Sequence, residues 1–162
     1  MLRSINQLSQ SLTSGTKKIV LAAAMLLTIG INSSFAAPTD GGNDAVTASF
    51  HKDFKKAQVL ETQTGKNYIK FTFKLNDMVL FAFYNEDGQL LAVSRNIKSN
   101  QLPIQLLMDV RKDYANYWIS DLFELTIDGN SNYYITLENA DSRITLRSYD
   151  SNDWEVYKKA KL

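Results

Sequence analysis

Two hydrophobic periods alternate along the chain after residue 43. From Asp44, apolar side chains recur every four positions at Val46, Phe50 and Phe54, which is the spacing of an amphipathic helix with Asp44 at its cap. Apolar and polar residues then alternate in four segments, residues 58–63, 68–74, 78–84 and 90–95. A period of two predicts half-buried strands, and the short polar connections between them predict an antiparallel meander.

The same order of elements follows in the second half of the chain. Pro103 stands where the first turn of a helix tolerates proline, and Leu106, Val110 and Tyr114 form the apolar stripe behind it. Four more strand-like segments are residues 117–127, 133–138, 143–149 and 154–158. Each half therefore reads as one helix followed by four strands.

The two halves also match position by position. The first helical stripe maps onto the second at a shift of 60, and residues 68–72 map onto 134–138 at a shift of 66. A one-residue slip would turn the core face of a strand outward. Residues 79–84 map onto 144–149 at a shift of 65. We therefore predict an α+β fold of two tandem α-β4 repeats, residues 44–98 and 99–162, with both helices packed on one face of an antiparallel sheet.

The N-terminus has the three parts of a secretory signal peptide. Lys17 and Lys18 precede an apolar run, residues 19–31, and Ser34-Phe35-Ala36 supplies small residues at the cleavage positions. We predict a signal peptide over residues 1–36 and a flexible leader over 37–43. The alternative is a retained anchor, but about 13 apolar residues are too few to cross the hydrocarbon core as a helix. The mature chain is then periplasmic or secreted, with no membrane span.

Composition narrows the classes of partner. Residues 1–36 hold three basic residues and no acidic ones, so the mature balance is 15 basic against 17 acidic residues. Nucleic acid is not expected as a partner, because phosphate binding needs a basic face. The chain has no cysteine, which excludes disulfides, thiolate metal sites and lipidation at a cysteine.

The layout resembles the PepSY-like, β-lactamase-inhibitor-protein-like (BLIP-like) periplasmic domains of Bacteroidetes-type envelopes. The residues that carry the resemblance are Phe50-x-x-x-Phe54, the turn Tyr84-Asn-Glu-Asp-Gly88, Leu102-Pro103, Tyr114, Tyr133-Tyr134 and Tyr149-Asp150. The resemblance implies a binding scaffold whose helices cover one side of the sheet and leave a concave face for a partner. In the inhibitor proteins a projecting hairpin also covers an enzyme's active site. Asp77 would be the projecting acid here, unless Asn76-Asp77 only serves turn geometry.

Catalytic and metal-binding patterns are weak. The single histidine, His51, lies on the wet side of the first predicted helix, and no cysteine is present to pair with it. Oxygen ligands gather at residues 85–88 and 150–153, but neither segment has the spacing of an EF-hand loop. No carboxylate pair stands out as a glycosidase site. We expect no catalytic residues, no metal and no cofactor.

Aromatic residues are the informative excess. Phe71, Phe73, Phe81 and Phe83 are assigned to the core phase of their strands. The opposite phase carries Tyr68, Leu80, Tyr84, Tyr134, Arg147 and Tyr149, which, with Asp77, we predict to bind the partner. Tyrosine and arginine are typical of protein-binding surfaces, although tyrosine also tolerates exposed strands.

The sequence thus favours a non-catalytic periplasmic module that recognises a protein or peptide through its open sheet face, with an inhibitor-like role as one form of it. A binder of small ligands or envelope glycans is the alternative from another class. A hydrolase with scattered carboxylates ranks third, and a purely structural role also stays open.

Overall fold

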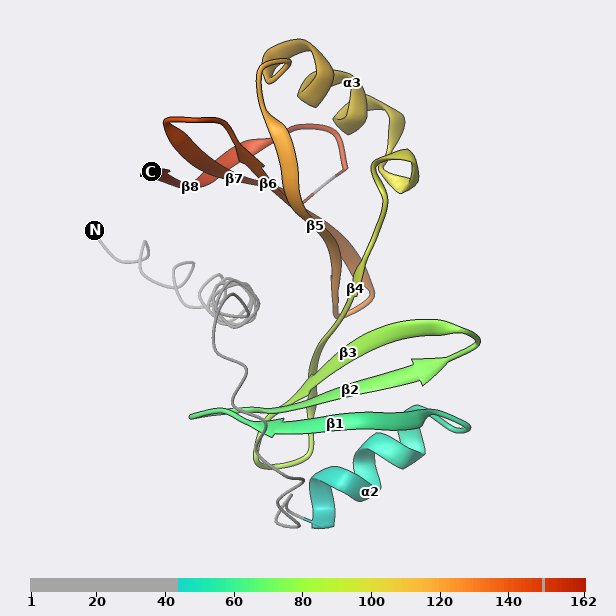
Figure 1. Cartoon of the computed structure of the whole chain (residues 1–162). Coiled ribbons are helices and arrows are strands. Elements are labelled where there is room, and N and C mark those ends of the chain that lie inside the picture. Colours follow the sequence, from blue (N-terminus) through green and yellow to red (C-terminus); the bar gives the residue numbers. More distant parts are fainter. Residues whose placement is uncertain (1–43, 150) are drawn as a thin grey trace, which may run out of the picture. The chain divides into compact units, whose positions relative to one another are not determined.

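The computed structural model describes residues 44–149 and 151–162, so the signal-peptide and leader predictions lie outside the described residues. Its elements alternate as the periods predict (Figure 1). They are α2 (Asp44–Asp53), β1 (Gln58–Thr64), β2 (Ile69–Leu75), β3 (Met78–Tyr84), β4 (Leu90–Asn96), the short 3-10 helix η1 (Ser99–Gln101), α3 (Ile104–Asp113), β5 (Trp118–Ile127), β6 (Asn130–Glu138), β7 (Ser142–Ser148) and β8 (Glu155–Lys161).

The strands form one antiparallel sheet of eight in chain order, β1 to β8. Each neighbour pair is antiparallel, including β4 with β5, which joins the first four strands to the last four. The α+β class and the antiparallel sheet are confirmed. Within the described residues, no helix is long and apolar enough to cross a membrane.

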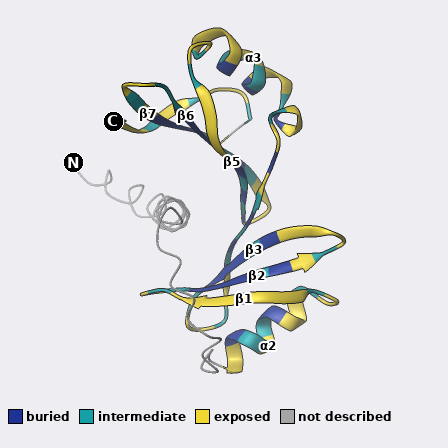
Figure 2. Cartoon of the chain, viewed as in Figure 1, coloured by how far each residue is buried: buried dark blue, intermediate teal, exposed yellow. Residues whose placement is uncertain are grey.

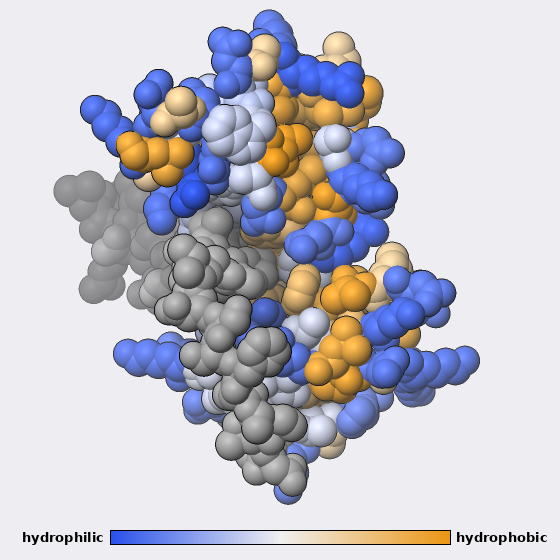
Figure 3. Space-filling view, viewed as in Figure 1, coloured by the Kyte–Doolittle hydropathy of each residue, from blue (hydrophilic) through white to orange (hydrophobic). Residues whose placement is uncertain are grey.

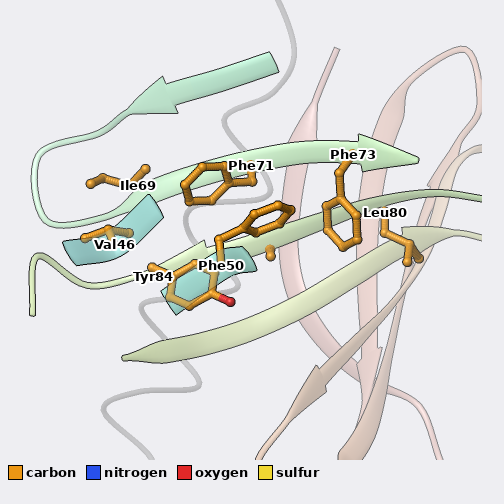
Figure 4. Packing of buried hydrophobic residues seen from close by; sticks show 8 residues of the cluster. Val46, Phe50, Ile69, Phe71, Phe73, Leu80 and Tyr84 are labelled. Carbon is orange, nitrogen blue, oxygen red and sulfur yellow. The ribbon is translucent and has the colours of Figure 1, made fainter. Parts of the chain in front are cut away.

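Aromatic rings dominate the core under α2. Val46 and Phe50 are fully buried on the helix, and the Phe50 ring stacks on Phe71 at 4.4 Å between centroids and meets Phe73 edge-on at 5.1 Å. Figure 4 shows these rings between the helix and the strands, with Tyr84 beside them. Burying a phenylalanine side chain contributes about 1.5–3 kcal/mol, so Phe50 is a main support of this half.

Branched aliphatic residues dominate the core under α3. The helix buries Leu106 and Val110, and Val110 packs in a cluster with sheet residues that are all at most 6% exposed. These are Leu122, Ile135, Leu137, Ile144 and Leu146. Trp154 closes this core from the β7–β8 connection, where its indole N–H donates to the Leu106 carbonyl at 2.8 Å.

Strand register places both helices on the same side of the sheet. Residues directly opposite each other in an antiparallel pair share a face. Ala82, which lies under α2, is opposite Val93, and Val93 is opposite Thr126. Two and four residues from Thr126 along β5 lie Glu124 and Leu122, and Leu122 packs in the α3 cluster. The helix-covered side is therefore continuous from β2 to β7, and the other side carries no helix among the described residues.

The predicted phase of β3 is wrong. Ile69, Phe71 and Phe73 face α2 as expected, but their opposite neighbours are Tyr84, Ala82 and Leu80. Phe81 and Phe83 therefore point to the helix-free side. The reason is the two-residue turn Asn76-Asp77, which leaves Leu75 paired with Met78 and sets odd residues of β2 opposite even residues of β3.

The shift of 65 between β3 and β7 fails for the same reason. Leu80 and Ala82 face α2, whereas Ile144 and Leu146 face α3, so only an even shift superposes like faces. The shift of 66 between β2 and β6 has the correct parity, since Ile69 and Phe71 map onto Ile135 and Leu137.

The edge strands are open along their length. Figure 2 shows β1 exposed where β2 and β3 carry buried stretches. The other edge, β8, is also mostly exposed and carries Lys158, Lys159 and Lys161, a composition that discourages pairing with further strands.

Candidate functional site

A cluster of rings around one arginine lies on the helix-free side of the second half. Tyr134 on β6 is opposite Phe123 on β5 and Arg147 on β7, so all three share this side. Arg147 is in turn opposite Glu155 on β8. We call Phe123, Tyr134, Arg147, Tyr149 and Tyr157 the arginine–aromatic cluster.

Ring contacts make the floor of this cluster rigid. Phe123 and Tyr134 stack with centroids 5.0 Å apart and planes 10° from parallel, and Tyr157 meets Tyr134 edge-on at 5.8 Å. Such pairs are each worth about 0.5–1.5 kcal/mol beyond the area they bury. Phe123 and Tyr134 are buried, which leaves Tyr149 and Tyr157 as the partly exposed rings of the cluster.

Arg147 is held from several directions. Its guanidinium carbon lies 4.6 Å from the centre of the Tyr149 ring and 5.0 Å from that of Tyr157. Its Nε donates to Oε1 of Glu155 at 2.6 Å. The Arg147 side chain is 21% exposed and Glu155 is 50% exposed. The charged group is thus fixed in orientation yet reachable from solvent.

The cluster is electrostatically coupled. Burial raises the pKa of Tyr134, and the neighbouring phenol of Tyr149 adds to the rise. Burial also raises the pKa of Tyr149, against the pull of the Arg147 charge. Burial opposes the charge of Arg147, but the hydrogen bond to Glu155 and the charges of Glu155, Tyr149 and Tyr134 together outweigh burial and raise the pKa of the guanidinium. At neutral pH the cluster therefore presents neutral phenols around a permanent cation.

The Tyr134 hydroxyl stands out among the polar atoms of the cluster. Tyr134 is 0% exposed, and its hydroxyl oxygen makes no well-formed hydrogen bond to a described residue, although Tyr149 lies close enough to influence its pKa. Most buried polar atoms make a well-formed hydrogen bond, so this hydroxyl is an exception whose nearest polar neighbour is the Tyr149 phenol.

Three predicted partner-binding residues, Tyr134, Arg147 and Tyr149, come together in this cluster. Tyr149 is 37% exposed, as a contact residue requires. Tyr68 lies on the same side of the sheet but in the first half, where its ring is 5.9 Å from that of Phe83. There Lys70 also lies over the Phe81 ring at 5.0 Å.

Leu80 and Tyr84 do not belong to the helix-free side, which corrects their prediction as parts of one open face. Both lie in the core under α2, with 9% and 0% exposure. The Tyr84 hydroxyl donates to Oδ2 of Asp53, at the end of the helix, at 2.9 Å. Tyr84 is a core ring whose polar end is satisfied by the helix it supports.

Asp77 lies apart from these residues, in the β2–β3 turn. Its side chain is 94% exposed and pairs with Lys74 at 2.9 Å. Asn76 and Asp77 have φ values of 50° and 64°, which is the left-handed conformation that a tight hairpin turn requires. The turn function of this pair is thus accounted for by its backbone.

Catalytic and metal-binding groups do not converge in the described part of the chain. His51 is exposed on α2, with its ring edge-on to Phe50 at 5.4 Å. Among the described residues no three His, Cys, Asp or Glu side chains gather as a metal site. Asp150, one of the predicted oxygen ligands, lies outside the described residues.

Sequence reasoning missed Phe123 and Tyr157 as members of the cluster and Glu155 as the ion-pair partner of Arg147. All three lie on strands that the period-two pattern predicts. Which side of the sheet they face, however, depends on the register with the neighbouring strands. A bulge between Thr145 and Leu146 in the β7–β8 pair shifts that register, so alternation along β8 alone does not place Tyr157. Phe123 could have been found as the opposite neighbour of Tyr134 once the turn between β5 and β6 was known.

Hydrophobic surface is distributed rather than gathered at one place. On the side shown in Figure 3, orange areas are interrupted by hydrophilic residues in the upper and lower parts of the described chain. The apolar residues with the largest exposure are Ile104 (72%), Val156 (59%) and Met108 (58%), apart from the C-terminal Leu162 (62%). Exposed apolar residues by themselves therefore do not single out a site.

No family model and no curated protein matches the chain. Solved structures match its fold. A BLIP-like protein from Bacteroides fragilis matches with a TM-score of 0.61 and 13% identity, over 80% of this chain and 89% of that one. A DUF2874 family protein from Bacteroides ovatus matches with 0.63 and 16%, over 78% and 89%. A proposed periplasmic protein from Bacteroides eggerthii matches with 0.65 and 10%, over 75% and 89%.

Proposed function

Because the chain has the fold of the BLIP-like proteins, we propose that it is a non-catalytic, exported module that binds a protein or peptide through the helix-free side of its sheet. The observation that carries the proposal is the arginine–aromatic cluster. It combines a buried, stacked floor with half-exposed phenol rings and a fixed cation.

The chemistry of the cluster favours a protein over other ligands. Interface cores are enriched in tyrosine and arginine, and energetically dominant residues gather where rings are packed and water is excluded. Tyr149 and Tyr157 offer apolar area with few rotatable bonds to order on binding. These side chains are already positioned by contacts within the protein, which lowers the entropic cost of association.

Export from the cytoplasm is part of the same proposal. The N-terminal sequence has the parts of a signal peptide, and one neighbour in fold is described as a proposed periplasmic protein. We propose cleavage after Ala36. Intact-mass measurement of the exported protein should give a chain that begins at Ala37, and a chain that keeps Met1 in the membrane fraction would contradict export in this form.

An internal duplication is the second part of the proposal. Each helix is followed by four strands, and the two helical stripes correspond at a shift of 60. Superposing residues 44–96 on 104–161 with like faces matched should give one common α-β4 unit. Divergent helix directions relative to their strands would argue against a common origin.

A site-specific photo-crosslinking experiment tests the binding role. A benzophenone side chain is placed at Tyr149 in the cluster or, as the matched control, at Met108, which is 58% exposed on α3 on the other side of the sheet. Both proteins are exported in the source cells and irradiated. We expect discrete adducts with an envelope protein from position 149 and none from position 108.

The outcome separates the candidate functions. Equal labelling from both positions, or labelling from neither, would contradict a protein partner at the cluster. If position 149 gives no protein adduct while purified envelope glycans bind the chain and the binding is lost in Tyr149→Ser, the glycan-binding alternative takes its place. A broad sheet surface favours the protein, whereas small ligands need a concave pocket.

A further inference from the structure

Two arginines on β7 make nearly the same ion pair but have different surroundings. Arg143 and Arg147 both lie on the helix-free side, four residues apart, and each donates from Nε to a glutamate, at 2.7 Å to Glu138 and 2.6 Å to Glu155. The side chain of Arg143 is 52% exposed, against 21% for Arg147. Only Arg147 lies over tyrosine rings. The pair forms an internal control for what the rings add.

Arg147 has donors left over. A guanidinium carries five N–H groups, and the Nε–H is the one bonded to Glu155. Its terminal nitrogens donate to no residue within the described ranges, and the buried hydroxyl of Tyr134 is likewise without a well-formed bond. These donors, together with the hydroxyl of Tyr149, lie in one electrostatically coupled group.

We propose that the terminal nitrogens of Arg147, with the hydroxyl of Tyr149, form a carboxylate-binding subsite that takes an Asp or Glu side chain of the partner. This inference rests on the binding role proposed above and names the chemistry of the partner. A guanidinium fork matches a planar carboxylate with two parallel hydrogen bonds. The rings beside it lower the local dielectric, which strengthens those bonds relative to water.

Glu155 sets the selectivity of the subsite. It neutralises the net charge of Arg147, so a distant anion is not drawn in by charge alone, and the ligand has to make the directed hydrogen bonds. Phosphate-rich surfaces are instead recognised by clusters of several basic residues. The mature chain has 15 basic against 17 acidic residues, which favours one acidic side chain over a phosphate-rich surface as the ligand.

The test uses the exported protein and two dye-labelled peptides, hexaglutamate and hexaglutamine, with binding followed by fluorescence anisotropy. We expect hexaglutamate to bind and hexaglutamine not to. Arg147→Gln should weaken the affinity for hexaglutamate about tenfold or more, whereas the matched Arg143→Gln should change it less than about twofold. Unchanged melting curves of both variants show that the fold is intact.

Glutamate-to-glutamine variants distinguish a binding role of Arg147 from a structural one. Glu155→Gln keeps an acceptor for Nε and removes the competing charge, so it should tighten hexaglutamate binding. Glu138→Gln should have no effect. If Arg147 only supported the sheet, loss of the Glu155 charge would lower the melting temperature without tightening binding.

Several results would overturn the subsite. The first is that hexaglutamate does not bind the unmodified protein, and the second is that Arg143→Gln and Arg147→Gln weaken hexaglutamate binding equally. The third is that millimolar inorganic phosphate displaces the peptide, and the fourth is that the protein binds phosphatidylglycerol vesicles in preference to the peptide. The binding role is judged separately by photo-crosslinking from position 149. Adducts that persist in Arg147→Gln would refute the carboxylate subsite and leave the proposed function standing.

Discussion

The two halves of the sheet share one order of elements but differ in the residues that are buried beneath the helix. In the first half the rings Phe50, Phe71 and Phe73 fill the helix side. In the second half the buried residues on the helix side are aliphatic, with partly buried rings such as Trp154 packed against them, and the stacked pair Phe123 and Tyr134 lies on the helix-free side. One architecture therefore accepts rings on either face, provided that volume under the helix is filled.

The connections that lie against the helices differ in the same complementary way. In the first half Gly88 is so close to α2 that an added Cβ would lie 2.7 Å from Ser49 Oγ. In the second half Trp154 fills the space beside α3 and bonds to the Leu106 carbonyl. In the first half a glycine lies against the helix that covers the large rings, and in the second half a tryptophan side chain lies against the helix that covers smaller aliphatic side chains.

The largest expected effect comes from removing the central ring of the first core. Phe50→Ala should lower the free energy of unfolding by roughly 3–5 kcal/mol, because it leaves a cavity among stacked rings. The matched change Val110→Ala, at the corresponding position of α3, removes less volume and should cost clearly less. Urea unfolding of both variants measures the difference. Equal losses would show that the two cores do not differ in their dependence on one residue.

Gly88 tests the close approach of the β3–β4 turn to α2. Gly88→Ala should cost somewhat more than about 1 kcal/mol, because φ is +75° and the Ser49 hydroxyl has to move away from the new Cβ. Gly129 has φ +80° with nothing within 4 Å of an added Cβ, so Gly129→Ala should cost only about 1 kcal/mol from the backbone. Similar losses for the two variants would mean that the contact with α2 contributes nothing.

Alkaline pH should destabilise the first core through Tyr84. Burial raises the pKa of Tyr84 far above its usual value, and the Asp53 hydrogen bond and charge add to the rise. The folded state then keeps a proton that the unfolded state loses above about pH 10, so stability is constant below that pH and falls above it. The slope approaches about 1.4 kcal/mol per pH unit for each such tyrosine. Tyr84→Phe should make the fall shallower, and an unchanged slope would contradict this assignment.

The smallest effect separates Tyr84 from Tyr149. Tyr84→Phe should lower the free energy of unfolding at neutral pH by about 1 kcal/mol, since Asp53 loses a buried partner. Tyr149→Phe should stay within about 0.5 kcal/mol, because this residue is 37% exposed. Thermal melts of both variants provide the measurement. A larger loss of stability for Tyr149→Phe than for Tyr84→Phe would contradict the assignment of Tyr84 to the core and of Tyr149 to the surface.

The elements themselves could be predicted from the sequence. The helical stripes and the strand segments agree with α2, α3 and the eight strands to within a few residues, because periods of four and two are local properties of the chain. The side chosen by β2 was also predictable, since Phe71 and Phe73 alternate with Thr72 and Lys74. The same alternation in the second half also identified three of the cluster residues as candidates, namely Tyr134, Arg147 and Tyr149.

The phase of β3 was determined by the sequence but was misjudged. Asn76-Asp77 predicts a two-residue turn, and such a turn makes Leu75 and Met78 opposite neighbours. With Phe73 in the core, Leu80 has to be there too. The assignment of the phenylalanines to the core phase instead placed Phe81 and Phe83 in the core, and it put Leu80 and Tyr84 on the helix-free side. Hairpin parity is the stronger signal, because hydrogen-bonded register leaves no freedom between faces.

The assembly of the arginine–aromatic cluster was decided by tertiary structure alone. Its members come from four strands, β5 to β8, and from the residue after β7, and they meet through the pairing of β5 with β6, of β6 with β7 and of β7 with β8. The bulge between Thr145 and Leu146 changes which residues of β8 face Arg147. The residue pattern of either strand by itself does not predict this bulge. A period of two places each side chain on one of two faces, but the sheet register, which is a relation between distant segments, decides which side chains become neighbours.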